Sequence, residues 1–571
     1  MLPATNTSSL LTSATHAHLM TPLDWLIVLV INGAVIGYGL YLARSTETSS
    51  EWFLGGRALP WWAVGLSMFA TNVDSADIVS VTGNTFKEGV HILTVYSLGS
   101  IAGGILAAFV IVPTIYRAGF FTNAEYLEAR FGPSTRVLSA LIQLQYRSSM
   151  LGIIIWSGHL LLTRFVELNS TQAWLLIVVL VILAGLYTAF GGLKSVVWTD
   201  AAQGIVMMLA ALVIFCVVWN KVGGWDGMQA ELARTDQSDL AHIGRYHGDD
   251  GKTPPWIVVI GWTIIGSGYW TVNHTQTMRL MGSRSLWDMK MAALWGVALS
   301  LPIMIVSVML GVLARAIPEF QSIPNDQSDT IYPLLASKLL DPGLKGLVAA
   351  GVVAAIVSTF DSMGSALSAI FTRDIYARFL VRDREDAHYV LVGRIATVGV
   401  LVLGFLYLPF IAYESSMIKA FTTLIPVFAT PLFVTYLAGV LTPAHRRSGL
   451  IGLIVGATYG LMALGDRMLY DAYGASGAWF PSWFTTRWTA FVWSILFTSL
   501  AIAVTTLVFG KQTGNVLEKT QDTGWLLKSR EQLPPLREHP FEGGVPRWLE
   551  PVLWTLVCAA GSAYVVFVLF W

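Results

Sequence analysis

Three carboxylates stand inside apolar stretches of the chain, where charged groups are rare. Asp74 and Asp77 follow the run PWWAVGLSMFATNV, and Asp361 follows GLVAAGVVAAIVSTF. A carboxylate in such a segment is costly enough to be a functional candidate by default. These acids would bind an ammonium group, coordinate a cation or accept hydrogen bonds from paired hydroxyls. Alternatively, each would reach water at a helix end or pair with a basic or imidazole group of another segment, for which the candidates are Arg147, Lys194 and His274.

A pair of hydroxyl side chains precedes the third acid. Ser358 and Thr359 are adjacent, and the carbonyl of Ala355 lies one helical turn earlier. Hard monovalent cations such as sodium prefer neutral oxygens of this kind. The alternative is structural, because Ser and Thr in membrane helices often bond to a carbonyl of the preceding turn or join two helices.

Apolar windows long enough to cross a bilayer recur along nearly the whole chain. With 54% hydrophobic and 12% charged residues among 571, the chain has too few polar groups to cover soluble domains of that size. Windows of about 20 apolar residues cross a hydrocarbon core as helices, and their continuity excludes a barrel of alternating strands. The sequence therefore predicts an all-α integral membrane protein with about 14 transmembrane helices. The expected spans are 24–43, 60–83, 91–113, 136–163, 172–190, 196–219, 256–278, 291–314, 343–371, 390–412, 416–441, 448–465, 487–510 and 551–571.

The distribution of Lys and Arg predicts how these helices are oriented. If the N-terminus is outside, the inward loops hold most of the basic residues, among them Arg117, Arg130, Arg373 and Arg378. The C-terminus is then outside as well. Residues 1–23 contain no Lys or Arg, so they lack the n-region of a signal peptide and are expected to form an exposed tail. We expect a multi-pass protein of the cell's inner (plasma) membrane.

Two of the spans have the composition of broken helices. The span 60–83 holds polar residues at mid-membrane depth, and the span 256–278 contains the weak run Gly266-Ser267-Gly268 near its middle. Interrupted helices at corresponding positions of two halves are typical of transporters with inverted repeats. The expected segments are an exposed tail (1–23), an extra helix and loop (24–59), a first five-helix repeat (60–219), an extracytoplasmic loop (220–255), a second five-helix repeat (256–441) and additional C-terminal helices with a polar loop at 511–550 (442–571).

Other classes of function find little support in the sequence. No polar stretch is long enough for an ordinary catalytic domain, and no nucleophile and base recur at catalytic spacing, so an enzyme is not expected. Cys216 and Cys558 both lie in apolar segments, which favours neither a disulfide nor a metal site. The formal net charge is zero, and no basic arm predicts a nucleic-acid partner.

Four stretches resemble the sodium/solute symporter family, and more closely its sodium/glucose cotransporter branch, in the right order along nearly the whole chain. They are FLGGRALPWWAVGLSMFATN (53–72), YTAFGGLKSVVWTDAAQGIVMM (187–208), GYWTVNHTQTMR (268–279) and GLVAAGVVAAIVSTFDSMGSALSAIFTRDIY (346–376). The resemblance implies a LeuT-type fold of two inverted five-helix repeats with flanking helices.

The resemblance also implies a set of ion-binding residues. The conserved sodium site of the family falls on Ala70, Val73, Ala355, Ser358 and Thr359. Asp200, in the element WTDAAQ, matches an acid linked to sodium release or to a second cation, with a capped or snorkelling residue near a helix end as the alternative.

For the substrate, the resemblance is partial. Tyr269 matches the aromatic gate beneath the sugar, and Asn72 matches an Asn that supports it. Sugar-binding side chains of the branch are lost elsewhere. They fall on Leu299, on Thr423, and on Ala76 and Asp77. The residues expected to contact the solute are Asn72, Asp74, Asp77, Tyr269, Asp361 and Thr423. His274 stands where the branch has Gln, and we interpret it as a hydrogen-bonded packing group.

The sequence therefore predicts a symporter that uses Na⁺ to import a small organic solute by alternating access. A sugar or sugar-like solute is the family expectation, and the acids Asp74, Asp77 and Asp361 leave another polar or cationic solute open. The rival hypotheses are a solute sensor without transport and a proton-coupled carrier. The expected partners are the solute, the sodium ion and the lipid bilayer, with the chain a monomer or a weak homodimer.

Overall fold

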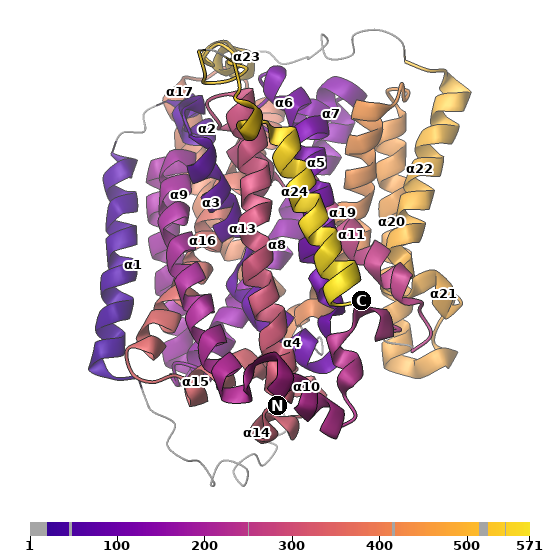
Figure 1. Ribbon diagram of the computed structural model, residues 1–571. Coiled ribbons are helices and arrows are strands. Elements are labelled where there is room, and N and C mark those ends of the chain that lie inside the picture. Colours follow the sequence, from indigo (N-terminus) through magenta and orange to yellow (C-terminus); the bar gives the residue numbers. More distant parts are fainter. Residues whose placement is uncertain (1–19, 45–47, 249–250, 414–416, 513–523, 543) are drawn as a thin grey trace.

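The computed structural model describes residues 20–44, 48–248, 251–413, 417–512, 524–542 and 544–571, and every regular element in them is a helix. Most of the predicted N-terminal tail and part of the 511–550 loop lie outside these residues. Long helices stand side by side in one bundle, with α1 at one edge and α20 and α22 at the other (Figure 1).

Among the residues that the structure describes, eleven stretches are long and apolar enough to cross a membrane. This confirms an all-helical membrane protein. Their elements are α1 (Pro22–Ala43), η2 to α6 (Val90–Arg117), α9 (Ser170–Val222), α11 (Pro255–Val272), α13 (Leu286–Arg315), α16 with the π-helical η8 (Leu344–Ala369 and Ile370–Leu380), α17 with η9 and the start of α18 (Asp386–Leu403, Gly404–Tyr407 and Leu408–Tyr413), α19 (Met417–Leu441), α20 (Ser448–Tyr473), α22 (Thr489–Phe509), and α24 with η13 (Pro551–Tyr564 and Val565–Leu569).

The remaining helices are short, or too polar to count among those stretches. They include α2 (Ser49–Leu54), α3 (Trp61–Asn72), α4 (Ser75–Glu88), α7 (Asn123–Phe131), α8 (Pro133–Arg164), α10 (Gly224–Arg234), α12 (His274–Met281), α14 (Pro318–Gln321), η7 (Asn325–Thr330), α15 (Ile331–Leu339), α21 (Ser482–Thr485) and α23 (Trp525–Glu531). Within the stretch Val90–Arg117, η3 is Val95–Gly99 and α5 is Ser100–Ile105.

The first predicted broken helix is the pair α3 and α4. Helix α3 ends at Asn72, and Val73 leaves the helical conformation with φ −105° and ψ 87°. Helix α4 then starts anew, because the carboxylate of Asp74 accepts a hydrogen bond from the backbone N–H of Asp77 and caps its first turn. The break thus exposes backbone groups in the middle of the bundle.

The second break lies elsewhere than the glycine run indicated. Residues 266–268 are helical within α11, and the chain breaks at Asn273, whose side chain caps α12 by accepting from the N–H of Thr275. Gly266 has a packing role instead, because a Cβ there would lie 2.6 Å from the backbone of Gly99. The interpretation of that run as the break was therefore wrong, since a small residue that permits close helix contact and one that interrupts a helix look alike in sequence.

Helix α9 contains two of the predicted spans. Gly192 interrupts it with φ 58° and ψ −159°, between the expected spans 172–190 and 196–219. The backbone of Trp52 approaches so closely that a Cβ at Gly192 would lie 2.4 Å from its carbonyl oxygen. Only glycine fits both the positive φ and this contact.

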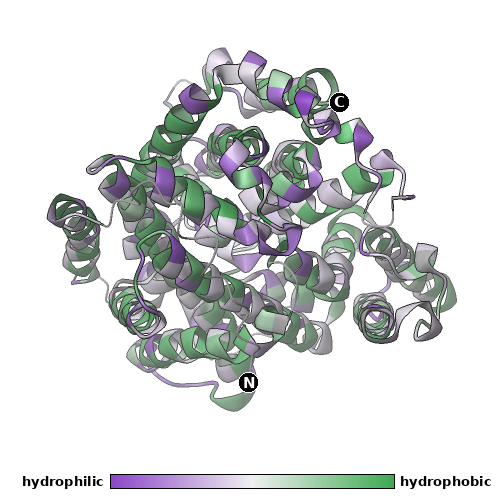
Figure 2. Ribbon diagram, turned by 90° about the horizontal axis from the view of Figure 1, so that it is seen from below, coloured by the Kyte–Doolittle hydropathy of each residue, from purple (hydrophilic) through white to green (hydrophobic). Residues whose placement is uncertain are grey.

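The core of the bundle surrounds α16. Helix α16 is almost entirely buried, whereas α1, α22 and α24 present many exposed apolar residues, such as Leu29, Leu507 and Leu556. Seen along the bundle, hydrophobic residues dominate the peripheral helices and hydrophilic ones appear among the inner helices (Figure 2). This is the arrangement of helices whose outer faces meet lipid.

The two ends of the bundle differ. Helices α7 and α23 lie at the end predicted to be cytoplasmic, and α10, α14 and α15 lie at the other (Figure 1). At that second end the last residues dock on the loop after α10, because Ile243 N–H donates to the carbonyl of Phe570 at 2.6 Å. The C-terminus and the 220–255 loop therefore share one side of the molecule, as the predicted orientation requires.

Candidate cation and solute sites

The residues predicted to bind sodium converge from two helices. The hydroxyl of Ser358 on α16 lies 3.2 Å from the carbonyl oxygen of Ala70 on α3 and 3.2 Å from that of Ala355. Thr359 donates to the Ala355 carbonyl at 3.0 Å, and Val73 is the first residue of the break. All five are fully buried. Carbonyl and hydroxyl oxygens without a formal charge are the donor set that suits a sodium ion.

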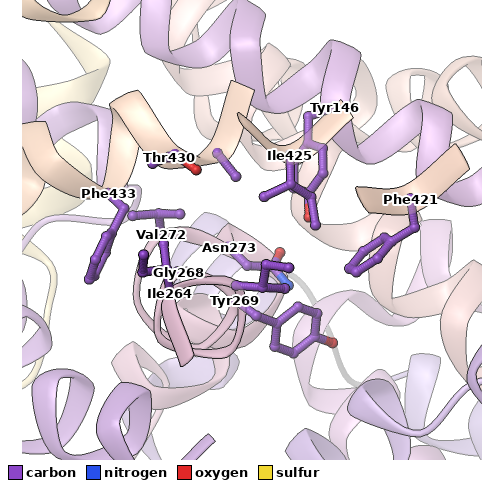
Figure 3. Close-up of a pocket in the computed structure, with 12 residues that line it drawn as sticks. Tyr146, Ile264, Gly268, Tyr269, Val272, Asn273, Phe421, Ile425, Thr430 and Phe433 are labelled. Carbon is purple, nitrogen blue, oxygen red and sulfur yellow. The ribbon is translucent and has the colours of Figure 1, made fainter. Parts of the chain in front are cut away.

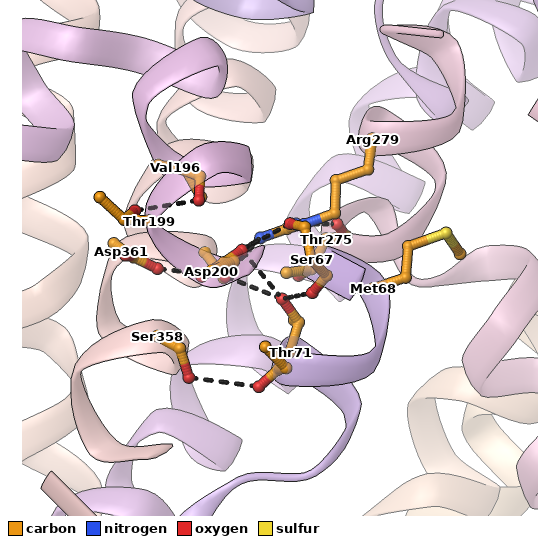
Figure 4. Close-up of polar contacts among 12 residues, drawn as sticks. Ser67, Met68, Thr71, Val196, Thr199, Asp200, Thr275, Arg279, Ser358 and Asp361 are labelled. Carbon is orange, nitrogen blue, oxygen red and sulfur yellow. Dashed lines mark hydrogen bonds and ion pairs between the residues drawn. The ribbon is translucent and has the colours of Figure 1, made fainter. Parts of the chain in front are cut away.

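Asp200 is held by a cation of the protein itself. Its Oδ2 lies 2.8 Å from Nη2 of Arg279 on α12 and accepts from the hydroxyl of Ser67 at 2.6 Å. Figure 4 shows Arg279 reaching Asp200 beside Thr71 and Ser358. Because Asp200 is fully buried and ion-paired, the alternative of a snorkelling residue near a helix end is excluded.

The buried polar network around Asp200, which we call the polar seam, also contains Asp361. Asp361 does not line the solute pocket described below. Tyr187 on α9 donates a hydrogen bond to one of its oxygens, and the hydroxyl of Ser362 donates to the other at 3.2 Å. Ser362 in turn contacts Thr71 on α3 at 2.9 Å. A chain of hydrogen bonds therefore links Asp361 to the segment just before the break.

A pocket lies beside the break. It encloses about 730 Å³ not filled by protein atoms, including the part open to solvent. Its walls come from α3, α4, α8, α11, α16 and α19 and the run from η3 to α5. Of the six residues predicted to contact solute, Asn72, Asp74, Asp77 and Tyr269 line it. We call it the acidic pocket.

The other two predicted solute residues do not line the acidic pocket. Asp361 is buried in the seam just described, and Thr423 lies on α19, where its carbonyl accepts from Arg467 at 3.2 Å. The sequence placed both on segments near the cavity. Which face of a helix a residue occupies depends on packing between helices, which could not be predicted from the sequence.

Tyr269 stands at a junction. Its hydroxyl donates to the carbonyl of Thr71 at 3.1 Å and accepts from the side chain of Gln276 at 3.1 Å, which ties α11 to the end of α3 and to α12. The same ring lines a second, smaller pocket of about 340 Å³ with Tyr146 and Phe421 (Figure 3). Tyr269 therefore lines both pockets, as do Ile265 and Phe421.

Arg147 on α8 also faces the acidic pocket, which the sequence did not predict. Its side chain is buried, it forms no ion pair with any described residue, and its Nε has no hydrogen-bond partner among them. The guanidinium lies 5.7 Å from the ring centroid of Tyr269 and 5.6 Å from that of Tyr146. Neither Asp74 nor Asp77 pairs with a described basic group, so the proposed pairing with Arg147, Lys194 or His274 does not occur.

His274 also departs from its prediction. Both ring nitrogens are buried and have no hydrogen-bond partner among the described residues, although its backbone N–H donates to Gln143 at 3.1 Å. It packs, as expected, but its ring is not hydrogen-bonded.

A second group of charges, also missed from the sequence, lies at the predicted cytoplasmic end. Arg136 on α8 lies 2.7 Å from Glu128 and 2.8 Å from Asp374, and Glu125 lies 2.7 Å from Arg373 and 3.2 Å from Arg530. These ion pairs join α7, α8, η8 and α23. We call them the α7 charge cluster, whose members are Glu125, Glu128, Arg136, Arg373, Asp374, Arg378 and Arg530.

A membrane-spanning helical bundle with paired broken helices, a buried set of neutral oxygens at one break and a pocket beside it defines a transporter. The model of the Sodium:solute symporter family matches residues 52–456, which is more than half of the chain. The protein therefore belongs to the sodium:solute symporter family, whose members are transporters and not enzymes. This confirms the family resemblance and the prediction of a multi-pass membrane symporter.

The relatives and solved structures agree with that assignment. The chain is 28% identical over 482 residues to the sodium/myo-inositol cotransporter 2 of Rattus norvegicus, covering 78% of this chain and 70% of the relative. It is 26% identical to the sodium/glucose cotransporter of Vibrio parahaemolyticus, covering 79% and 88%. A substrate-bound, outward-open Na⁺-coupled sialic acid symporter superposes with a TM-score of 0.73 at 21% identity, covering 86% and 99%. This chain shares the fold of that symporter, which is a LeuT-like transporter fold.

Proposed function

We propose that this protein imports a small polar organic solute together with sodium by alternating access. The observation that carries the proposal is the convergence of Ala70, Ala355, Ser358 and Thr359 at the helix break. Unwound backbone in a membrane is costly unless its carbonyls find partners, and a sodium ion supplies one. Val73 would contribute its carbonyl from the break itself.

We propose fourteen crossings in the same account. Three crossings are added to the eleven apolar stretches of the described residues. They are the broken pair α3 and α4, helix α8, and a second crossing within α9, which is divided at Gly192. The repeats then run from α3 to the end of α9 and from α11 to α19, close to the predicted segments 60–219 and 256–441. Helices α1, α20, α22 and α24 flank them.

Coupling follows from where the sodium would sit. An ion bound by both α16 and the break joins two parts of the bundle, so it favours whichever conformation keeps them together. The neighbouring pocket is bordered by Asn72 of the same break and by Tyr269, which bonds to Thr71. Sodium binding therefore orders the pocket wall, and solute binding in turn favours sodium binding, as linkage requires.

Asp200 has a supporting part in this proposal. Its carboxylate is charge-balanced by Arg279, and the network continues through Ser67, Thr71 and Ser362 toward the sodium site. We propose that Arg279 takes the place of a second cation while sodium is bound. If Arg279 turned away, Asp200 would offer the next negative charge on the way out, which fits the predicted role in ion release.

Uptake measured in proteoliposomes tests the function. A sodium gradient and a proton gradient are imposed separately on liposomes holding the full chain, with labelled inositol, glucose and amino-sugar solutes outside. We expect accumulation with the sodium gradient alone. Accumulation with the proton gradient alone would identify a proton-coupled carrier, and solute binding without flux under either gradient would identify a sensor.

A further inference from the structure

The carboxylates of the acidic pocket form few bonds within the protein. Asp74 accepts from the N–H of Asp77 at 2.9 Å through Oδ1, and Asp77 accepts from the hydroxyl of Tyr96 at 2.6 Å, also through Oδ1. Between described residues these are the two bonds of ordinary length and angle, and the backbone N–H groups of Ala76 and Asp74 also act on the carboxylates of Asp74 and Asp77, respectively. Both side chains are half-buried and line the pocket, so their carboxylates are accessible to a ligand.

The place where an anionic solute would bind a broken helix is already occupied. The N-terminus of α4 carries partial positive charge and favours a carboxylate, and Asp74 supplies that carboxylate from the chain itself. A negative group of a solute would meet Asp74 and Asp77 there and be repelled. The helix end therefore stabilises the acids and excludes anions.

With both acids ionised, the pocket would carry one net negative charge. Asp74 and Asp77 are two acids, and Arg147 is the one described basic side chain that lines the pocket. Arg147 forms no contact pair with either acid, although it is near enough to act on both electrostatically. A neutral solute would leave one negative charge enclosed in the membrane, whereas a solute with a single positive charge would neutralise it.

Two buried donors in the same pocket also lack partners. They are Nδ2 of Asn72 and Nε of Arg147, on side chains that are 5% and 3% exposed. Buried donors without partners are costly, and both of these residues line the cavity. Oxygen atoms of a solute, such as hydroxyl groups, would satisfy them. The aromatic rings of Trp262, Tyr269 and Phe421 line the same space and suit both a cation and the apolar face of a sugar ring.

We infer that the solute carries one protonated amine together with hydroxyl groups, as an amino sugar or amino polyol does, and that Asp74 and Asp77 bind the ammonium. An ammonium has three donors, which two carboxylates can share. The hydroxyls then accept from Asn72 and Arg147. This inference rests on the proposed transport function and adds the chemistry of the transported solute.

The test uses four matched probes on the full chain. They are glucosamine, glucose, N-acetylglucosamine and glucuronate, which differ in whether they carry an ammonium, a neutral hydroxyl, an amide or a carboxylate. Sodium-dependent thermal stabilisation in detergent and sodium-driven uptake in proteoliposomes are measured at a pH where the amine is protonated. We expect glucosamine to bind and to be transported about tenfold better than any of the others.

Variants localise the effect. Asp77→Asn keeps the size of the side chain and its bond to Tyr96 but removes the charge, and it should weaken glucosamine binding by about tenfold to a hundredfold. Asp77→Glu should retain part of it. Asp226→Asn, an exposed acid on α10, is the matched control and should change nothing. Thermal stability without solute verifies that each variant is folded.

Several results would overturn the inference. Glucose or N-acetylglucosamine binding as well as glucosamine would indicate a neutral polyol site, and a preference for glucuronate would assign the solute's anion to Arg147. No response to glucosamine, or an Asp77→Asn variant that shifts only the sodium concentration for half-saturation, would also refute it. Stabilisation by sodium without any solute is measured in the same assay, so loss of the amine preference alone leaves the proposed sodium coupling intact.

Discussion

Two arginines of helix α8 show how differently one membrane helix can use the same side chain. Arg136 and Arg147 are both buried and lie about three turns apart. Arg136 contacts Glu128, Asp374 and Glu125 in the α7 charge cluster. Arg147 faces the acidic pocket without an ion pair. The ion pairs of Arg136 hold helices together. We interpret Arg147, which has no ion pair with a described residue, as a side chain that meets the solute.

The same contrast separates the carboxylates. Asp200 and Glu125 are paired with guanidinium groups of other helices, whereas Asp74 and Asp77 line the pocket without an ion pair to a described residue. The α7 charge cluster joins α7, α8, η8 and α23, so it fixes elements at one end of the bundle. The acidic pocket leaves its charges ready for exchange with a solute.

The largest expected effect comes from removing Arg136. Arg136→Met leaves Glu128 and Asp374 buried with fewer partners, which should lower the free energy of unfolding by about 3–5 kcal/mol. Urea or thermal unfolding in detergent measures it. Arg284→Met is the control, because that guanidinium is half exposed and its ion pair is local, with Asp288 four residues later in the chain. If Arg136→Met were as stable as the control, the cluster would not be a structural element.

The pH dependence of stability should separate paired from unpaired acids outside the membrane-spanning segments. Burial acts to raise the pKa of Glu125, but Arg373, Arg530 and Arg136 outweigh it and lower the pKa to about 2 from 4.5. Its contribution is thus present above about pH 4.5 and lost as the pH falls toward 2. Burial raises the pKa of Asp329 on η7 to about 6 from 3.8, against its bond from the Met417 N–H.

For Asp329 the sign is opposite. The folded state binds the proton more tightly, so this contribution is full below about pH 3.8 and is lost as the pH rises through 6, by about 1–3 kcal/mol. Asp329→Asn should therefore remove a decline in unfolding temperature between pH 4 and 7, while Glu125→Gln should remove a rise between about pH 2 and 4.5. Identical pH profiles for wild type and Asp329→Asn would contradict the role given to burial.

The smallest expected effect on stability comes from Arg147. Arg147→Met removes a buried guanidinium that has no ion-pair partner, so the free energy of unfolding should change by less than about 1 kcal/mol, or rise. The same unfolding assay as for Arg136→Met gives the direct contrast. A loss as large as that of Arg136→Met would show that Arg147 is structural, and the distinction between the two arginines would fail.

Much of this could be predicted from the sequence. Apolar windows and the four family stretches led to the helices, the first break and the convergence of Ala70 with Ser358, because hydropathy and local motifs are properties of neighbouring residues. The second break at Asn273 was misplaced, since glycines that permit close packing resemble glycines that interrupt a helix. Helix α23, within the predicted polar loop, was not expected.

Partnerships between distant residues were beyond the sequence. Glu125 and Arg530 lie far apart in the chain and meet only because α23 folds back on α7. The sequence suggested Arg147 as an ion-pair partner for the acids. The residues next to it in the sequence did not indicate that it would face a pocket without an ion pair. Asp361 and Asp74 looked alike in sequence, yet the helix face that each occupies places one in the seam and the other in the pocket.

The most direct test of the account is a sodium titration of thermal unfolding. Sodium, with potassium as the matched ion, is added to purified wild type and to the double variant Ser358→Ala, Thr359→Ala. We expect sodium alone to raise the unfolding temperature of the wild type as its concentration passes the dissociation constant, and to leave the double variant unchanged from its sodium-free value. An equal sodium-dependent rise in both proteins would contradict a sodium site between the break after α3 and helix α16.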